Sequence, residues 1–490
     1  MTALYRSLAP IVALVAAALC LLLTFDVQAQ QPAYTPYDIG SPTLVDLYVS
    51  PTGDDAAGDG SAAAPFRTLT AAWERIPREQ PLEQTGYRIR LMPGTYTAEE
   101  APNYWESRYG TPEHPILIQA MNGRDTVILP HVNVFDSRYL YFIDLTFAPG
   151  TDAFHCERCD HLLLRGSRFV GADPESYDAQ ETVKVNQSQH VFIEDSDISG
   201  AWNNAVDFVA VQHGHVITSR IHNAGDWCMY AKGGSADLLI AGNTVYDCGT
   251  GGVSAGEGTG FQYMVEPWLQ YEAYDLRILD NVIHDTAGAG IGVQGGTRIL
   301  IAGNILYRAG ERSHMVEFVF GLRSCDGQPG DEGRERCDAY AAAGGWGDSA
   351  IADGDNAIRI PNRSVYFYNN ILYNPPGYQS AYSHFTIFAP RTGEAQMNAG
   401  VPVPTRADED LRIRGNVIWN GGADMPLGVE TSPDFPAGCP PDNPACSAAQ
   451  LRADNAINTV EPRLVDPEGG DYRPAPGWRF TTYAIPEFPA

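Results

Sequence analysis

One phrase of apolar and polar positions recurs along the middle of the chain. Two or three apolar residues are followed by a small or polar residue and then by more apolar residues, as in LLRGSRF at 163–169 and FIEDSDI at 192–198. Successive copies lie 29, 23, 24, 38, 23, 66 and 46 residues apart, so a period near 23, with insertions, explains them all. The small or polar position is occupied by Ser167, Ser196, Ser219, Asn243, Asn281, Asn304, Asn370 and Asn416.

A period of this length, with three short β-rich runs in each repeat, predicts one coil of a parallel β-helix. A single coil cannot bury its apolar face, so successive coils stack at the strand spacing of about 4.8 Å. The Asn or Ser lies at the bend between two strands, where stacked copies would form an Asn ladder. Leucine-rich repeats, the competing solenoid, need Leu at fixed steps and a helix in each repeat, and both are missing. We therefore predict an all-β, right-handed parallel β-helix.

The predicted solenoid covers residues 46–420, and the Pro-rich segment 421–490 is expected to be irregular and to pack on it. A helix expected from Thr68 would cap the first coil, because terminal repeats must cover an open apolar end. Extra residues between copies of the phrase predict loop excursions, which in solenoids gather on one face that often binds ligands. The excursions are expected near 256–271, 311–356 and 377–410.

The N-terminus has the layout of a secretory signal peptide. Arg6 precedes the apolar run 11–23, and Val27-Gln28-Ala29 follows with small or apolar residues at the cleavage positions. We therefore predict a signal peptide over 1–29, a linker over 30–45, and a protein that is secreted or periplasmic. No later segment is apolar for long enough to span a bilayer, so we expect no membrane insertion.

The net charge of −28 argues against nucleic acid or an anionic membrane surface as a partner. We expect a monomer whose partner is an acidic polysaccharide substrate. A protein this acidic must then supply local positive charge at its site, from basic side chains or from bound Ca²⁺.

Eight cysteines follow the predicted signal peptide, and an even count in an exported protein favours disulfides. Neighbours in sequence suggest the pairs 156–159, 228–248, 325–337 and 439–446, although spacing alone does not fix the connectivity. The pair Cys156 and Cys159 could instead be half of a zinc site, but no second pair stands at ligand spacing.

The segment after the linker carries a family resemblance. The opening YVSPTGDD, followed by PFRTLTAA and then IRLMPGTYT, resembles exported β-helix proteins of the pectate-lyase-like superfamily. More narrowly it resembles the pectate lyases of family nine and the chondroitinase-B and alginate lyases of family six. The resemblance extends over roughly residues 45–420 and implies a lyase with a Lys base and bound Ca²⁺. The cluster of calcium-binding aspartates of the family-nine lyases has no match here.

The use of lysine gives the sharpest chemical signal. Of 32 basic residues only Lys184 and Lys232 are Lys, and all the others are Arg. The coil alignment stacks Lys184, Asp207 and Tyr230 in one outward column, and it places Asn186, Val209 and Lys232 in the next. Two coils and two residues separate the lysines, and Asp207 lies on the coil between them. A cross-strand surface pair without function would give the same pattern.

Lys differs from Arg because burial or a nearby cation can lower its pKa enough for it to act as a base. Cleavage of a uronate-containing glycan by β-elimination needs such a base and a cation that neutralises the substrate carboxylate. We predict Lys232 as the base, with a pKa lowered toward neutrality, and Lys184 as the cation. Asp207 completes the predicted catalytic set.

Other residues near this face are candidates for binding. Asp226 and Glu257, which lies in a Gly-rich run, are predicted as Ca²⁺ ligands, because carboxylate oxygens suit that ion. The predicted substrate-binding residues are Tyr230, Asn186, Trp227, Trp268 and His314.

A second outward column contains aromatic rings, which routinely stabilise β-helices, and we assign it to structure. The column comprises His222, Tyr246, His284, Tyr307, Tyr373 and Trp419.

The favoured function is a polysaccharide lyase. One alternative is an inverting glycoside hydrolase that uses Asp207 with Glu257 or Asp226. The other is a non-catalytic glycan-binding or surface protein.

Overall fold

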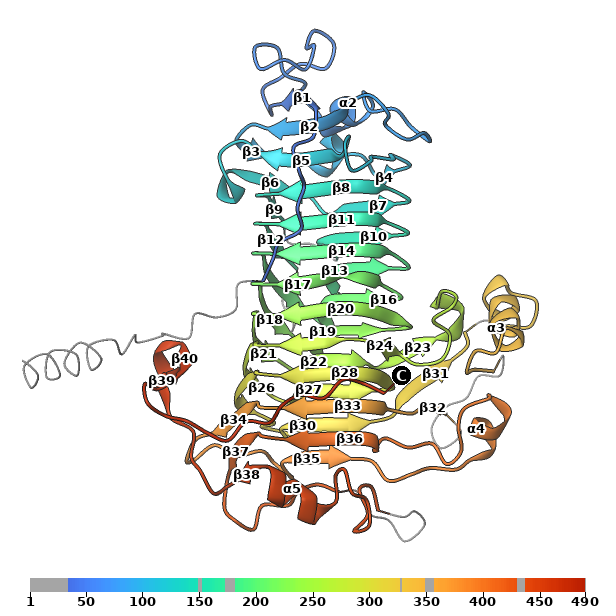
Figure 1. Cartoon of the computed structure of the whole chain (residues 1–490). Coiled ribbons are helices and arrows are strands. Elements are labelled where there is room, and N and C mark those ends of the chain that lie inside the picture. Colours follow the sequence, from blue (N-terminus) through green and yellow to red (C-terminus); the bar gives the residue numbers. More distant parts are fainter. Residues whose placement is uncertain are drawn as a thin grey trace, which may run out of the picture. The chain divides into compact units, whose positions relative to one another are not determined.

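The computed structural model describes residues 34–148, 152–171, 181–326, 328–348, 357–429 and 437–489, so the predicted signal peptide lies outside the described residues. Residues 36–490 form one unit, in which the chain winds through three long parallel sheets (Figure 1). We name them sheets A, B and C in the order in which each coil visits them. Most coils contribute one strand to each sheet, as a parallel β-helix requires.

Sheet A contains β1 (Leu44–Val49), β2 (Gly86–Leu91), β5 (Ile116–Ala120), β8 (Arg138–Ile143), β11 (Asp160–Arg165), β14 (Gln189–Glu194), β17 (Gln212–Ile217), β20 (Ser235–Ala241), β24 (Ala273–Tyr274), β25 (Arg277–Leu279), β28 (Gly296–Ala302), β33 (Arg363–Tyr368) and β36 (Glu409–Arg414). Sheet B contains β3 (Gly94–Thr95), β6 (Val127–Leu129), β9 (Thr146–Phe147), β12 (Arg168–Val170), β15 (Asp197–Ala201), β18 (Arg220–Ala224), β21 (Thr244–Cys248), β26 (Val282–Thr286), β29 (Ile305–Ala309), β34 (Ile371–Asn374), β37 (Val417–Asn420) and β38 (Ala456–Ile457). Sheet C contains β4 (Trp105–Glu106), β7 (Val132–Phe135), β10 (Phe154–Glu157), β13 (Glu181–Asn186), β16 (Asn204–Val209), β19 (Trp227–Lys232), β22 (Gly251–Gly256), β27 (Ala289–Gln294), β30 (Val316–Val319) and β35 (Phe385–Ile387).

The remaining elements are short, and among the described residues no helix is long and apolar enough to cross a membrane. A small sheet is made of β23 (Gly258–Gly260), β31 (Gly321–Ser324) and β32 (Ile358–Ile360), and a hairpin of β39 (Leu464–Asp466) and β40 (Asp471–Pro474). The helices are α2 (Leu69–Trp73), α3 (Glu332–Ala342), α4 (Glu394–Asn398), α5 (Ala448–Asp454), η1 (Ala98–Glu100), η2 (Arg124–Thr126), η3 (Phe261–Tyr263) and η5 (Pro467–Gly469).

The interior of the solenoid is a stack of apolar side chains in register. Val183 pairs with Val206, and Val206 pairs with Met229, so the offset between these coils is the expected 23 residues. All three side chains are fully buried, and burial of a side chain of this size contributes roughly 1.5–3 kcal/mol.

The predicted Asn ladder is present at the bend between sheets A and B. The side-chain oxygen of Asn281 accepts hydrogen bonds from the backbone and side-chain N–H groups of Asn243, both at 3.0 Å, and its own amide donates to the carbonyl of Ile240. Each ladder amide satisfies backbone groups of neighbouring coils, whose burial without a partner would cost about 1–3 kcal/mol each. The ladder continues through Asn304, Asn370, Asn416 and Asn455.

The expected helix caps the first coil. It begins after Thr68, whose hydroxyl oxygen accepts a hydrogen bond from the backbone N–H of Ala71 at 3.1 Å. Trp73 of this helix is buried and packs edge-on against Trp105 in the first strand of sheet C, with ring centroids 4.9 Å apart. The open apolar end of the solenoid is thereby covered.

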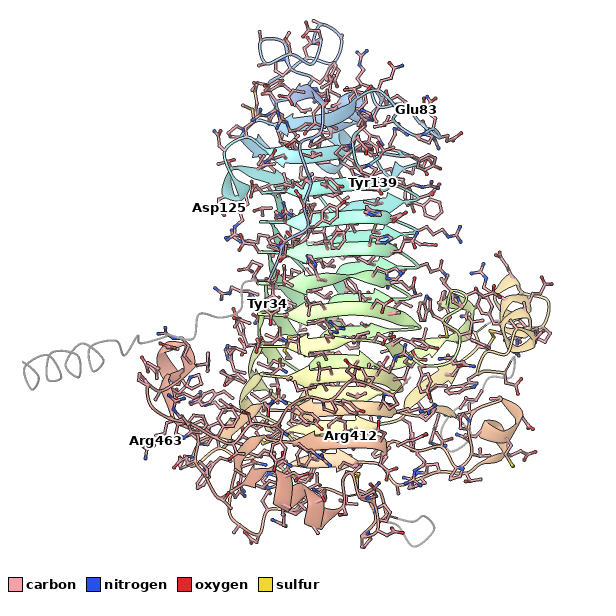
Figure 2. All side chains as sticks on the ribbon, viewed as in Figure 1. Tyr34, Glu83, Asp125, Tyr139, Arg412 and Arg463 are labelled. Atoms are coloured by element: carbon pink, nitrogen blue, oxygen red, sulfur yellow. A yellow bond between two sulfur atoms is a disulfide. The ribbon has the colours of Figure 1, made fainter. Side chains whose placement is uncertain are left out.

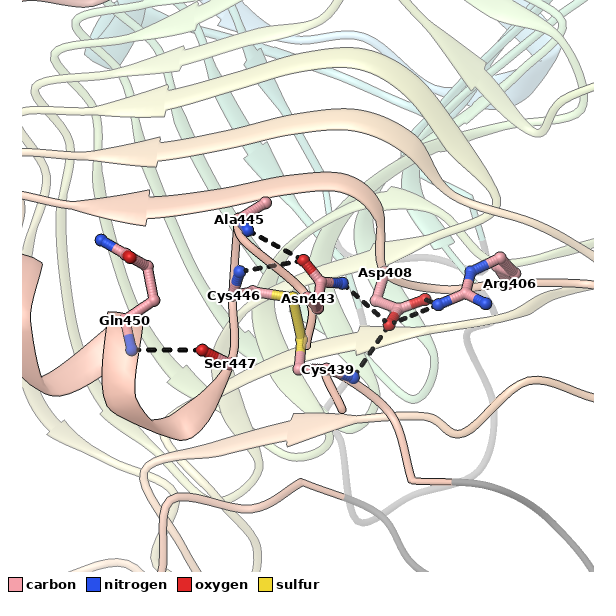
Figure 3. Close-up of a disulfide and its surroundings, with 8 residues drawn as sticks. All are labelled: Arg406, Asp408, Cys439, Asn443, Ala445, Cys446, Ser447 and Gln450. Carbon is pink, nitrogen blue, oxygen red and sulfur yellow. Dashed lines mark hydrogen bonds and ion pairs between the residues drawn. A yellow bond between two sulfur atoms is a disulfide. The ribbon is translucent and has the colours of Figure 1, made fainter. Parts of the chain in front are cut away.

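The last coils are closed by the C-terminal segment (Figure 3). Asp408 accepts a hydrogen bond from the backbone N–H of Cys439 at 2.8 Å and pairs with Arg406 at 2.9 Å. Cys439 forms a disulfide with Cys446, immediately before α5, whose Leu451 is fully buried in the core. All four suggested cysteine pairs are disulfides. The zinc alternative for Cys156 and Cys159 is wrong, because their sulfur atoms are bonded to one another.

Both end segments of the unit cover the outer face of sheet A. The ring of Tyr37 stacks on Phe192 with centroids 4.3 Å apart, and its backbone N–H donates to Glu194 at 2.6 Å. Near the other end, Tyr483 and Phe488 pack on apolar side chains of β28 and β33. In Figure 1 the dark blue and dark red segments cross the front strands.

The outer face of sheet B carries the predicted aromatic column. Its rings stack, with centroids 4.5 Å apart for His222 and Tyr246 and 4.9 Å for Tyr246 and His284. The hairpin β39–β40 covers part of this face, because Tyr472 stacks on His284 and Glu468 accepts a hydrogen bond from Tyr307 at 2.7 Å.

The excursions gather at one corner of the solenoid. Extra residues follow the carboxyl ends of β22, β30 and β35 in sheet C and lead back into sheet A. The predicted stretches 311–356 and 377–410 also contain the coil strands β30 and β35, because their sequences lack the recurring phrase. The excursions pack on one another through β23, β31 and β32 and through α3 on η3.

A buried ion pair fastens two of these excursions together. The side chains of Arg323 and Glu272 are fully buried, and the guanidinium Nε donates to the carboxylate at 3.0 Å. Glu272 also accepts from the backbone N–H of Gly233 at 2.9 Å, next to Lys232. This pair therefore anchors the excursions beside the strand that carries Lys232.

Candidate active site on the outer face of sheet C

The structure confirms the alignment that stacked the two lysines on one face. Lys184 pairs with Asp207, and Asp207 pairs with Tyr230, while Asn186, Val209 and Lys232 form the parallel column two residues on. We call the outward surface of β13, β16 and β19 the lysine face. The alternation of strands turns these side chains away from the apolar core.

Lys184 lies between two carboxyl groups. Its Nζ donates to Glu181 at 3.2 Å and lies 3.9 Å from an Oδ of Asp207. Burial by itself lowers the pKa of Lys184, but the nearby charges of Asp207 and Glu181 raise it above its ordinary value. The sequence pattern does not indicate Glu181, because the long first step of the repeat leaves the start of this strand undefined.

Asp207 is the most perturbed carboxyl group of the face. Only 2% of the residue is exposed, and burial raises its pKa from 3.8 to about 7, although Lys232 and Lys184 act in the opposite direction. Its Oδ1 is buried and has no hydrogen-bond partner in the part of the chain that the structure describes. A carboxyl group with a pKa near neutrality can both give and take a proton at ambient pH.

Lys232 is held by a carboxylate from the first excursion. Its Nζ donates to Glu257 at 2.7 Å and lies 4.2 Å from the centroid of the Tyr230 ring. The predicted lowering of the Lys232 pKa is wrong: burial lowers it, but Glu257 and Asp207 together raise the pKa above its ordinary value. The ammonium is therefore charged in the free protein. The raised pKa of Lys232 depends on Glu257, whose position is set by the fold of the excursion.

The predicted calcium ligands do not make a preformed calcium site. Burial raises the pKa of Asp226, and Glu257 raises it further, so this carboxyl holds its proton more strongly than usual. Glu257 is already paired with Lys232. Among the described residues, neither carboxylate belongs to a cluster of three acidic, His or Cys groups at ligand spacing. These residues do not fit Ca²⁺ as they lie, and calcium remains an untested prediction.

The predicted binding residues lie in different surroundings. Tyr230 is on the lysine face, and burial raises its pKa well above 10. Asn186 lies in the next column, two coils away from Tyr230, and its buried Oδ1 has no hydrogen-bond partner among the described residues. Trp227 is 2% exposed and packs with Tyr230 and Ala289, so little of its ring is free for a sugar. Trp268 packs edge-on against Tyr274, next to the apolar cluster formed under the excursions.

His314 belongs to a second polar cluster further along sheet C. Its Nε2 lies 3.1 Å from Glu317, and its Nδ1 lies 2.6 Å from the hydroxyl of Thr386. Gln294 donates to the same carboxylate at 3.1 Å. Glu317 and Thr386 continue the outward column of Tyr230 across intervening Ser254 and Gly292. The sequence pattern does not indicate Thr386, because its strand lies within a predicted excursion.

One family model agrees with the fold. Residues 152–316 match the family model of the right-handed beta helix region, and no curated protein sequence matches the chain. Similar solved structures include a rhamnogalacturonan lyase (13% identity, 76% of this chain and 87% of the other, TM-score 0.45) and a pectate lyase (14%, 92% and 94%, 0.40). An alginate lyase from Paenibacillus sp. is 14% identical over 56% of this chain and 97% of its own, with a TM-score of 0.37.

The parallel sheets, the stacked coils and the match of residues 152–316 lead to one conclusion. The chain is a right-handed parallel β-helix protein.

Proposed function

We propose that the protein is an exported enzyme that cleaves an acidic, uronate-containing polysaccharide by β-elimination at the lysine face. One observation carries the proposal: the only two lysines of the chain flank a buried carboxyl group with a pKa of about 7 on one outer face of the solenoid. A protein of net charge −28 repels a polyanion, so it needs local cations where the substrate binds.

The two ammonium groups have the charge that a uronate carboxylate requires. The pKa values of Lys184 and Lys232 are both raised, so both side chains are charged when the substrate arrives. Ammonium groups that neutralise the carboxylate stabilise the enolate-like intermediate formed when the adjacent C–H bond is broken. In our proposal Lys232 therefore binds the substrate carboxylate and is not the base.

Asp207 takes the role of proton acceptor. In the elimination the base removes the proton next to the carboxylate, a carbon–carbon double bond forms, and the glycosidic oxygen leaves and takes up a proton. Asp207 is the carboxyl group of this face whose protonation changes near neutral pH. As a base it must be ionised, so kcat/KM should rise with pH through about 7.

A second candidate is an inverting glycoside hydrolase. The observation in its favour is that the pKa values of both Asp207 and Asp226 are raised, which is the property of a general acid. In that reaction Asp207 would have to be protonated, and activity would fall rather than rise through about pH 7.

The deciding experiment incubates the mature protein with pectate, alginate and glycosaminoglycans. Ultraviolet absorbance of unsaturated uronides, together with new reducing ends, supports elimination. Reducing ends without that absorbance support the hydrolase. Binding without either signal would leave a non-catalytic glycan-binding protein and overturn the proposal.

Variants of the two lysines test the assigned roles on any substrate that is cleaved. Lys232→Arg keeps the positive charge but offers no accessible neutral form, so it should retain measurable turnover with a raised KM. Lys232→Ala removes the charge and should lose far more turnover than Lys232→Arg. Complete loss in Lys232→Arg, with an unchanged melting temperature, would instead make Lys232 the base.

A further inference from the structure

A column of histidines stands on the outer face of sheet A, away from the lysine face. The second residue of successive strands adopts a left-handed backbone, with φ of 58° at His161, 54° at His190 and 57° at His213. Side chains other than Gly, Asn, Asp and His rarely occupy this conformation. Tyr139 begins the column and is labelled in Figure 2; its ring stacks on His161 with centroids 4.1 Å apart.

Two of these imidazoles converge on one carboxylate. The rings of His161 and His190 stack with centroids 4.2 Å apart, and their Nδ1 atoms lie 2.7 Å and 2.9 Å from the same Oδ1 of Asp160. The three atoms lie within 4.8 Å of one another. Asp160 and His161 lie on β11 and His190 on β14, so the cluster joins two neighbouring coils.

The spacing of these atoms is close to that of a first coordination shell. Ligand atoms about 2.1 Å from one metal ion, at tetrahedral or octahedral angles, lie about 3.0–3.4 Å apart. The two nitrogen–oxygen distances need to open by only a few tenths of an ångström to reach that spacing. All three side chains are partly exposed, at 19% for His161, 35% for His190 and 29% for Asp160, so an ion can reach them from solvent.

We propose that Asp160, His161 and His190 bind a divalent transition-metal ion such as Zn²⁺ or Ni²⁺. Two imidazole nitrogens and one carboxylate oxygen are ligands that suit Zn²⁺ and Ni²⁺. Ca²⁺ and Mg²⁺ instead take oxygen ligands. The remaining coordination positions are open to water. The bound ion replaces the hydrogen bonds between the imidazoles and Asp160 and links β11 to β14 from outside the coil.

The cluster has a structural consequence at the N-terminal segment. Tyr37 lies against His161, with centroids 6.3 Å apart, and Arg165 of the same strand donates to the Tyr37 carbonyl. An ion that fixes β11 to β14 therefore also stiffens the surface on which this segment packs. The expected readout is stability, which makes the proposal independent of the enzymatic activity.

The test uses the metal-free mature protein, purified without a histidine tag. Titration calorimetry and thermal unfolding are measured with Zn²⁺, Ni²⁺, Ca²⁺ and Mg²⁺ in turn. Zn²⁺ and Ni²⁺ should bind at one site and raise the melting temperature, while Ca²⁺ and Mg²⁺ should do neither. Binding should weaken in acid, because protonated imidazoles do not bind metals.

Variants locate the site. His161→Asn and His190→Asn keep a residue that tolerates the left-handed backbone, so the fold should survive. Each should weaken Zn²⁺ binding by roughly tenfold or more, and Asp160→Asn should act in the same direction. The matched control is His222→Asn on sheet B, where one imidazole faces one carboxylate, Asp197, at 3.2 Å. It should bind Zn²⁺ as the unchanged protein does.

Either of two results would overturn the proposal. The unchanged protein could show no saturable Zn²⁺ or Ni²⁺ binding, which would leave Asp160 as a hydrogen-bond acceptor for two histidines and nothing more. Alternatively, His161→Asn and His190→Asn could both keep full affinity, which would place the bound ion elsewhere on the protein.

Discussion

Replacing Asp207 by Asn removes a carboxyl group that is buried in the folded protein, where its ionisation is unfavourable. The residue is 2% exposed, and burial raises the pKa of Asp207 to about 7 from the ordinary 3.8. The folded state therefore holds a proton that the unfolded state has released between these two values. For a carboxyl group with a raised pKa, the free energy of unfolding falls as pH rises through this window.

The magnitude follows from the two pKa values. At about 1.4 kcal/mol for each pKa unit, the difference between 3.8 and about 7 corresponds to about 4 kcal/mol at 25 °C. Asn has nearly the same shape and no charge, so Asp207→Asn should be more stable than the unchanged protein above neutral pH, by up to that amount. Lys184 keeps Glu181 as a partner at 3.2 Å, so its charge stays compensated in the variant.

Urea unfolding followed by circular dichroism measures the effect at about pH 4 and about pH 8. The two proteins should have similar stability at the lower pH. At the higher pH the variant should be the more stable of the two, and it should lose turnover. Asp237→Asn is the control for removing a carboxylate from the outer surface, because this side chain is 44% exposed. A variant that is no more stable at the higher pH, or a difference that does not change with pH, would refute the burial argument.

Three further changes have defined outcomes. Glu272→Gln leaves the fully buried guanidinium of Arg323 without its counter-charge and should destabilise the excursions by about 3–5 kcal/mol, measured by thermal unfolding; no loss would mean that the pair is dispensable. Burial lowers the pKa of His384 to about 4, so on acidification the unfolded state takes up a proton at a higher pH than the folded state. The free energy of unfolding should therefore fall by up to about 3 kcal/mol between about pH 6.5 and 4. His384→Gln should reduce that loss, as measured by acid unfolding curves. Added Ca²⁺ should leave the melting temperature unchanged, because Glu257 is paired with Lys232, and a rise would instead support the calcium prediction made from the sequence.

The sequence predicted the parts of the site that lie on uninterrupted coils. Between Val183 and Lys232 the repeat runs without insertions, so counting in steps of 23 placed both lysines and Asp207 correctly. Alternation along a strand then fixed which side chains face outward.

Prediction failed where a contact depends on an excursion. Glu257 lies at the start of one, and only the folded loop brings its carboxylate to 2.7 Å from Lys232 and reverses the expected change in the lysine pKa. Thr386 lies within another, where no recurring phrase marks the strand. Burial of Asp207 was equally hidden, because a pattern of alternating residues carries no information about what covers the outer face.

The common corner at which the excursions leave the solenoid bears on how such a protein can evolve. An insertion between sheets C and A does not shift the strands on either side, since Asn281, Asn304 and Asn370 hold neighbouring coils in register at a different bend. Loops at this corner can therefore lengthen, shorten or be exchanged while the columns on sheet C keep their spacing. The architecture therefore lets the loops around the lysine face change without a change in the face itself.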